Sequence, residues 1–200
     1  MKYTTVVADP PWPIEWVGGG AYRTNGRGEK HLNAKFKAPL PYSTLSINDI
    51  CAFRVIDFVA SDAHLYLWAP DKFLISGDAA RVAIAWGFKP LRLFVWAKNG
   101  FALGRFPRPQ HEQALICRRG NLAFRVNNVG SVQTWKMPYA RSGRSFARVH
   151  SRKPDEFLDL VERASPGPYL ELFARRNRRG WAAWGNECHS ENLDMTGVFL

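Results

Sequence analysis

Asp9, Pro10, Pro11 and Trp12 follow one another near the start of the chain and together can hold an aromatic amine. Such an amine is a poor nucleophile because its lone pair is delocalised into the ring. Acceptors on its two hydrogens favour a pyramidal nitrogen, and the Asp9 carboxylate and the Pro10 carbonyl can each supply one, while the prolines stiffen the turn. Trp12 can stack on a flipped base, a contact worth about 1–3 kcal/mol. We interpret the four residues as a catalytic site for transfer to the exocyclic amine of a nucleobase; a rigid turn with a core tryptophan is the alternative.

The residues that would position this site form a short β-branched run, Thr4–Ala8, which predicts a strand ending at Asp9. Pro70 and Arg175 also follow apolar runs that predict strands. In parallel α/β sheets, ligands bind beyond the carboxyl ends of the strands. We therefore expect Asp9, Pro70 and Arg175 to meet at one edge of a sheet.

Strands and helices are expected to alternate along the chain. Apolar and β-branched runs predict strands over residues 4–8, 63–68, 91–97, 113–118, 169–173 and 181–184. Helix-start signals and helical spacing predict helices that begin at 46, span 72–86 and begin at 154. This alternation implies an α/β fold, with a mostly parallel central sheet and helices on both faces.

Length and composition fit one domain spanning residues 1–200. The chain is 46% hydrophobic with eight Trp, enough for one core. No apolar run reaches the roughly 18 residues of a membrane span, and no secretory signal is visible, so we expect a cytoplasmic protein. Three Cys far apart argue against a disulfide framework and fit a reducing compartment. Adjacent Cys188 and His189 come nearest to a metal site, and we expect no metal.

Positive charge is concentrated in residues 105–152, which hold ten basic side chains and one acidic side chain, Glu112. The net charge of this segment is 10 − 1 = +9, against +11 for the whole chain. Aromatic residues are interleaved with these cations, a combination that suits phosphate contact and base stacking. We predict that the segment binds nucleic acid through Arg141, Arg144 and Arg148; a solvated basic face without a ligand is the alternative.

Asp9-Pro10-Pro11-Trp12 resembles the signature of adenine-N6 methyltransferases that use S-adenosylmethionine. The chain is most similar to the family of the eukaryotic messenger-RNA adenosine methyltransferase and its bacterial and phage relatives. The similarity covers roughly residues 4–187 and is weakest in the basic segment. It continues through five further segments: Pro41–Leu45, His64–Trp68, Ser151–Gly167, Glu171–Arg175 and Trp184–Glu187.

This resemblance implies a Rossmann-like class I methyltransferase fold in circularly permuted order, with the catalytic strand before the cofactor strand at 169–173. The implied cofactor, S-adenosylmethionine, has a carboxylate, an ammonium, a sulfonium and a ribose diol. Lys153 would contact the carboxylate and Glu187 suits the diol, whereas a solvated lysine and a plain turn are the alternatives. Tyr42 would line the target-base side. The resemblance implies six cofactor-binding residues: Asp9, Lys153, Arg175, Asn177, Asn186 and Glu187.

Near the expected cofactor site, the sequence differs in two ways from the patterns of other nucleotide-binding enzymes and of longer family members. Ala174–Asn177 stands where a Gly-rich loop follows the cofactor strand of dinucleotide-binding enzymes, which fits this family and counts against such an enzyme. Asp9 lies too near the start for the upstream strand and acidic residue of longer members, so we expect either that the adenosine pocket is completed by other residues or that cofactor affinity is weak. No zinc finger or separate recognition domain is visible. If the protein recognises a particular nucleotide sequence, that recognition would therefore come from loops 10–46 and 99–150.

These observations predict a catalytic adenine-N6 methyltransferase with DNA as the preferred substrate and RNA as the alternative. A non-catalytic nucleic-acid-binding partner subunit is a second hypothesis, disfavoured because Asp9 and Trp12 are intact. An amino-cytosine methyltransferase is a third, disfavoured because those enzymes usually have Ser or Asn in place of Asp9. A homodimer, or a heterodimer with a related subunit, is compatible with each hypothesis.

Overall fold

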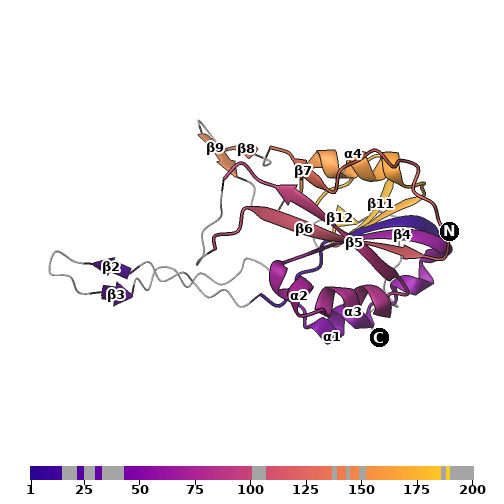
Figure 1. The fold of residues 1–200 in the computed structure, drawn as a ribbon, viewed down its shortest axis with the longest axis horizontal. Coiled ribbons are helices and arrows are strands. Elements are labelled where there is room, and N and C mark those ends of the chain that lie inside the picture. The colour runs from indigo at the N-terminus through magenta and orange to yellow at the C-terminus, as the bar shows by residue number, and fades with distance from the viewer. Residues whose placement is uncertain are drawn as a thin grey trace.

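The computed structural model describes residues 1–14, 22–24, 30–32, 43–100, 107–136, 139–142, 145–148, 152–185 and 188–189. A central sheet carries helices on both faces, as the sequence predicts, and two small ribbons stand beside it (Figure 1). Within these ranges, no helix combines the length and apolar character needed to cross a membrane.

Eight described strands form the main sheet: β1 (Tyr3–Ala8), β4 (Val59–Ala69), β5 (Lys89–Ala97), β6 (His111–Arg119), β7 (Val132–Thr134), β10 (Tyr169–Leu172), β11 (Trp181–Gly185) and β12 (Cys188–His189). Their order is β12-β11-β10-β1-β4-β6-β5-β7. All run in one direction except β6 and β12, which confirms the mostly parallel sheet. The neighbours β11, β10, β1 and β4 therefore present their carboxyl ends at one edge.

The helices α1 (Ile47–Ala52), α2 (Asp71–Ile75) and α3 (Asp78–Ala85) cover one face, and α4 (Asp155–Ala164) covers the other (Figure 1). Ser46 caps α1 in a capping box with Asp49, as predicted. The single helix predicted over 72–86 is wrong, because Gly77 adopts a left-handed φ of +84° and divides it into α2 and α3. Gly87, with a φ of +85°, follows α3 as predicted.

The apolar stripe predicted after residue 154 is the buried face of α4. Phe157, Leu158, Val161 and Ala164 are all buried in this helix. The ring centroid of Phe157 lies 4.6 Å from that of Trp68 on β4. Each large apolar side chain removed from water contributes about 1.5–3 kcal/mol. This packing fixes the segment that leads into α4 against the centre of the sheet.

The sequence predicts a long loop over residues 10–46, which is wrong for two short described strands, and it leaves the elements of 119–150 unassigned. β2 (Tyr22–Thr24) and β3 (Lys30–Leu32) pair as an antiparallel ribbon apart from the main sheet (Figure 1). β8 (Tyr139–Ser142) and β9 (Ser145–Arg148) form another, and β7 extends the main sheet. Strands of three or four residues give too few alternations for a periodic signal. The assignment of one domain to residues 1–200 stays a prediction.

A buried polar network joins β4 to the end of α4. His64 is fully buried, with Nε2 3.0 Å from the Leu122 carbonyl and Nδ1 2.8 Å from the Ser165 hydroxyl. Because a carbonyl only accepts, Nε2 carries the proton and Nδ1 accepts from Ser165. The Tyr66 hydroxyl lies 2.7 Å from the same Ser165 oxygen. Burial lowers the pKa of His64, so the network holds a neutral imidazole.

We expect His64→Leu to lower the free energy of unfolding by about 1–3 kcal/mol at pH 7.5, because it leaves buried partners unpaired. The unfolded chain protonates His64 near its ordinary pKa of 6.5, whereas the folded protein resists it. The stability that His64 contributes is therefore complete above pH 6.5 and falls as the pH drops below it. Urea unfolding at pH 7.5 and 5.5 should show a smaller difference between wild type and variant at pH 5.5. An equal difference at both pH values would contradict a neutral buried His64.

Candidate active site

A cavity of about 610 Å³ opens at the carboxyl edge of the sheet. This volume lies within the usual range for small-ligand sites. Asp9 follows β1, Pro70 follows β4 and Arg175 lies beyond β10, and all three line the cavity. The prediction that these residues meet at one edge is therefore confirmed. The antiparallel strand β6 adds its amino end, His111–Gln113, to the same wall.

The turn from Asp9 to Trp12 is held by hydrogen bonds and by ring packing. The Pro10 carbonyl accepts from the Trp12 N–H at 2.8 Å. The Trp12 indole donates to the Trp68 carbonyl at 2.8 Å, and its ring stacks on Phe73 with centroids 5.0 Å apart. Trp12 is only 3% exposed, which leaves little ring surface for a nucleobase. The stacking role expected for Trp12 does not match this arrangement, and we assign Trp12 to holding the turn that presents Asp9.

Asp9 is the end of a chain of alternating charges. Lys153 Nζ lies 2.6 Å from Asp9 Oδ2 and 3.2 Å from Glu112 Oε2, and Lys98 pairs with the other oxygen of Glu112. Burial would lower the pKa of Lys153, but the carboxylates of Asp9 and Glu112 outweigh it and raise that pKa. Burial would likewise raise the pKa of Glu112, and Lys153 and Lys98 reverse the effect and lower it. Lys153 and Glu112 are thus both held in their charged forms.

Because of these ion pairs, Lys153 must move before a substrate can hydrogen-bond to the Asp9 carboxylate. The Lys153 ammonium now occupies one Asp9 oxygen, and Glu112 offers Lys153 a second partner. An incoming amine therefore competes with Lys153 for the Asp9 carboxylate. Glu112 was not predicted as a site residue, although it is the one acidic residue in the basic segment 105–152. That isolation among cations is a signal that could have identified it.

A second polar cluster lines the cavity on the side of β4 and β6. Gln113 Nε2 lies 2.8 Å from Asp71 Oδ1 and 3.1 Å from His111 Nε2. An amide nitrogen only donates, so Gln113 is the donor to Asp71, and His111 Nε2 lies 3.4 Å from the same Asp71 oxygen. The cluster offers donors and acceptors to a substrate, and none of its members was predicted from the sequence.

The opposite side of the cavity is formed by the turn beyond β10. Phe173 adopts a φ of +60°, and the Ala174 N–H donates to the Trp184 carbonyl at 2.9 Å. A Cβ on Gly185 would lie 2.1 Å from the Ala174 carbonyl oxygen, so the approach of the two backbones requires glycine there. Phe173, Trp184 and Arg175 line the cavity. This side therefore combines aromatic surface with one cation, without a Gly-rich loop.

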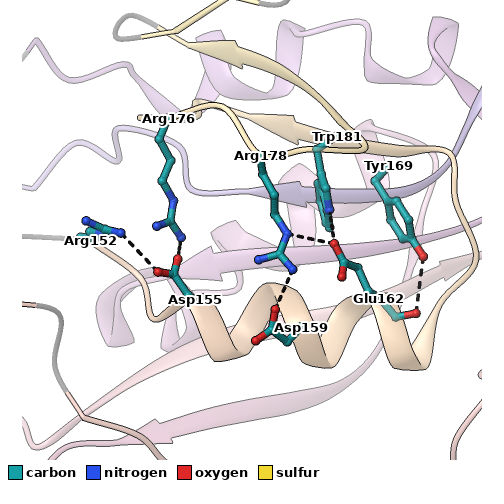
Figure 2. Close-up of polar contacts among 8 residues, drawn as sticks. All are labelled: Arg152, Asp155, Asp159, Glu162, Tyr169, Arg176, Arg178 and Trp181. Atoms are coloured by element: carbon teal, nitrogen blue, oxygen red, sulfur yellow. Dashed lines mark hydrogen bonds and ion pairs between the residues drawn. The ribbon is translucent and has the colours of Figure 1, made fainter.

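Arg178, in the basic run that follows β10, stabilises α4 and does not line the cavity (Figure 2). Arg178 lies 2.6 Å from Asp159 and 2.9 Å from Glu162, which also accepts from the Trp181 indole at 2.7 Å. The hydrogen bond from Arg178 is the main cause of a lowered pKa at Glu162. A second ion-pair group at the first turn of the helix joins Asp155, Arg152 and Arg176.

The remaining predicted site residues are not assembled around the cavity by the described structure. Asn177 is exposed and is not part of the cavity wall, so the structure does not support a cofactor contact there. Arg141 lies in β8 and Arg148 in β9. The other four lie outside the described residues, and their roles stay predictions: Tyr42, Arg144, Asn186 and Glu187.

Residues 3–187 match the model of the MT-A70 family. The chain belongs to the MT-A70 family. The type II methyltransferase M.MunI of a Mycoplasma species is 27% identical over 210 residues, which span 97% of this chain and 81% of that protein. The N6-methyladenosine RNA methyltransferase MTA1 of Cryphonectria parasitica is 27% identical over 92% of this chain and 51% of its own length. The human N(6)-adenosine-methyltransferase catalytic subunit METTL3 is 26% identical over 96% of this chain and 29% of its own length.

These matches confirm the family that the Asp9–Trp12 motif and its companion segments indicate. They also confirm, at the level of the MT-A70 family, the predicted enzyme class of adenine-N6 nucleic-acid methyltransferases. The chain spans most of M.MunI but about half or less of MTA1 and METTL3. Functions carried by other parts of those longer relatives are therefore not transferred to this chain.

Proposed function

We propose that this MT-A70 chain transfers the methyl group of S-adenosylmethionine to the N6 amine of adenine in DNA. One observation carries the proposal: Asp9 and Pro10 line a cavity of about 610 Å³, between its β10 side and its β4–β6 side. The Asp9 carboxylate and the Pro10 carbonyl oxygen would then lie between the methyl donor and the target nucleotide. The polar β4–β6 side then suits the target nucleotide, which must leave its helix if it is paired.

The residues on the β10 side fit S-adenosylmethionine chemically. Phe173 and Trp184 supply apolar surface for its adenine, and Arg175 and Lys153 supply cations for its carboxylate. When bound, this cofactor supplies a methyl group on a sulfonium, which passes to nitrogen as the carbon–sulfur bond breaks. The side chains of the protein have to hold the amine at that methyl and exclude water from it.

In this mechanism, Asp9 binds and orients the target amine. It accepts a hydrogen bond from N6 once Lys153 has moved towards Glu112, and the Pro10 carbonyl has a second lone pair for the other N6 hydrogen. The N6 lone pair is then free to form the new bond, and the surplus proton leaves nitrogen to Asp9 or to water. The rate gain comes from alignment and fixed charges, without a covalent enzyme intermediate.

DNA is the preferred substrate because the chain is compact and its similarity covers most of the type II methyltransferase M.MunI. RNA is the alternative, favoured by the similarity to the RNA methyltransferase MTA1. A partner subunit, whether a second copy or a related chain, and a cytoplasmic location stay predictions.

The experiment that tests this function is transfer of radiolabelled methyl from S-adenosylmethionine to single- and double-stranded DNA and RNA, followed by digestion to nucleosides. The expected product is N6-methyldeoxyadenosine from DNA. Label found only in N6-methyladenosine would show that the substrate is RNA. Label on cytosine would overturn the assignment of adenine as the target base. Nucleic-acid binding without transfer on any substrate would favour the non-catalytic partner.

Replacing Arg141, Arg144 and Arg148 together by Gln should weaken DNA binding and lower its salt dependence. Each phosphate that the variant no longer neutralises reduces the slope of log K against log salt by about 0.9 for duplex DNA, so the slope should fall by about 2–3. Fluorescence anisotropy at several salt concentrations measures this. The matched control neutralises three exposed cations that do not line the cavity: Lys89, Arg92 and Arg163. An equal change of slope in both triple variants would assign the effect to net charge alone.

A further inference from the structure

A second cavity, of about 210 Å³, lies between β10 and the residues that lead into α4. Asp9 and Lys153 line both this cavity and the larger one. Glu171 lies opposite Val7 in the register of β1 and β10, and Val7 packs in the core beneath α4. The Glu171 side chain is therefore on the α4 face of the sheet, where the small cavity is found.

Two polar atoms in the wall of this small cavity are buried and unpaired. Glu171 Oε2 and Arg152 Nε have no hydrogen-bond partner anywhere in the described part of the chain. Arg152 reaches Asp155 only through Nη2, at 3.3 Å. Leaving a buried donor or acceptor unpaired is costly, so each of these atoms calls for a partner, such as a water molecule or a ligand. The Glu171 oxygen is an acceptor, and the Arg152 nitrogen is a donor.

The small cavity is lined by charged groups of both signs. Its acidic groups are Asp9 at the end of β1 and Glu171 within β10. A ligand that fills such a space gains most if it is itself a zwitterion, with a cationic end for the carboxylates and an anionic end for the cations. The cations in the wall are Arg152, Lys153, Arg175 and Arg176.

We propose that Glu171 and Arg152 bind the amino-acid end of S-adenosylmethionine, Glu171 accepting from its α-ammonium and Arg152 donating to its α-carboxylate. This inference rests on the proposed function, since it concerns the same donor. An ammonium gives Glu171 Oε2 the donor that it lacks, and a carboxylate gives Arg152 Nε its acceptor. The carboxylate also offers Lys153 an anion other than Asp9, so donor binding would free Asp9 for the target amine.

The titration of Glu171 supports this role. Burial first, and then the nearby Asp9 carboxylate, raise the pKa of Glu171 to about 7, although Arg178 acts in the opposite direction. The cations that line the small cavity together with Glu171 are Arg152, Lys153, Arg175 and Arg176. A bound ammonium stabilises the ionised form of Glu171. Affinity for the donor should therefore rise between pH 5.5 and 7.5, as Glu171 loses its proton in the free protein.

The test compares two ligands by calorimetry: S-adenosylmethionine, and 5′-methylthioadenosine, which lacks the amino-acid end. Glu171→Gln should weaken S-adenosylmethionine binding about 10- to 100-fold at pH 7.5, because it removes a charge-assisted hydrogen bond, and should leave 5′-methylthioadenosine binding unchanged. Arg152→Gln should show the same selectivity. Glu156→Gln, at an exposed position on α4, is the matched control and should change neither affinity. The pH dependence between 5.5 and 7.5 should flatten in Glu171→Gln.

Each outcome separates this inference from the proposed function. Unchanged S-adenosylmethionine affinity in Glu171→Gln and Arg152→Gln, or an equal loss for both ligands, would overturn the amino-acid assignment while the methyltransferase proposal stands. If the wild-type protein bound neither ligand, the proposed function would fail, and this inference with it. Thermal unfolding of each variant identifies a loss that comes from a damaged fold, and such a loss would affect both ligands alike.

Discussion

Asp9→Ala should lower the rate of methyl transfer by at least about 10²–10³-fold while S-adenosylmethionine binding remains detectable. The substitution removes the carboxylate that polarises the amine and can take its proton. Lys153 keeps Glu112 as a partner at 3.2 Å, so its charge stays neutralised and the fold should hold. Single-turnover transfer to a DNA oligonucleotide, with a separate calorimetric titration of the donor, measures both quantities.

The control for this prediction is a carboxylate in the same cavity that does not contact Lys153. Asp71 lines the cavity and bonds Gln113 instead. Asp71→Ala should lower the transfer rate by no more than about 10-fold, the effect of removing one positioning hydrogen bond. Transfer at the wild-type rate by Asp9→Ala would remove Asp9 from the mechanism.

Lys153→Met should raise the dissociation constant of S-adenosylmethionine about 10- to 100-fold, because it removes a cation that serves the donor carboxylate. It also leaves the carboxylates of Asp9 and Glu112 without the ammonium that now separates them. The pKa of Glu112, which Lys153 and Lys98 hold down, should rise in the variant. The stability that Glu112 contributes above its ordinary pKa of 4.5, and that is lost as the pH falls below it, should shrink accordingly.

Lys72→Met is the matched control for Lys153→Met. Lys72 lines the same cavity but is exposed and lies on the β4–β6 side. Its substitution should leave donor affinity unchanged and, if it has an effect, alter nucleic-acid binding. Equal donor affinities for wild type and Lys153→Met would refute the assignment of Lys153 to the carboxylate.

The parts of the fold that the sequence predicts well are those with a local signal. Thr4–Ala8 and Tyr169–Phe173 are β-branched or apolar runs that end where chemistry-bearing residues begin, and both are strands within a residue or so. The apolar spacing from Phe157 to Ala164 likewise gives α4. Because parallel strands share one carboxyl edge, these local signals were enough to place Asp9 and Arg175 at the same cavity.

The site contacts that the sequence does not predict depend on residues far apart in the chain. Lys153 meets Asp9 across 144 positions, and no spacing rule links them. Glu171 sits inside a predicted strand, where period-2 alternation gives its face but not its unpaired oxygen. Trp12 was expected to stack on a base because its ring offers a flat face, yet its indole bonds the Trp68 carbonyl and its ring stacks on Phe73. Tertiary packing decided the role of each of these side chains.

The most direct test of the account is a structure of the protein with S-adenosylhomocysteine and a DNA oligonucleotide that contains the target adenine. We expect the N6 nitrogen within hydrogen-bond distance of an Asp9 carboxylate oxygen and of the Pro10 carbonyl, with Lys153 withdrawn from Asp9. An adenine bound elsewhere, or Lys153 still paired with Asp9 in the full complex, would contradict the central claim that this carboxylate presents the amine for methyl transfer.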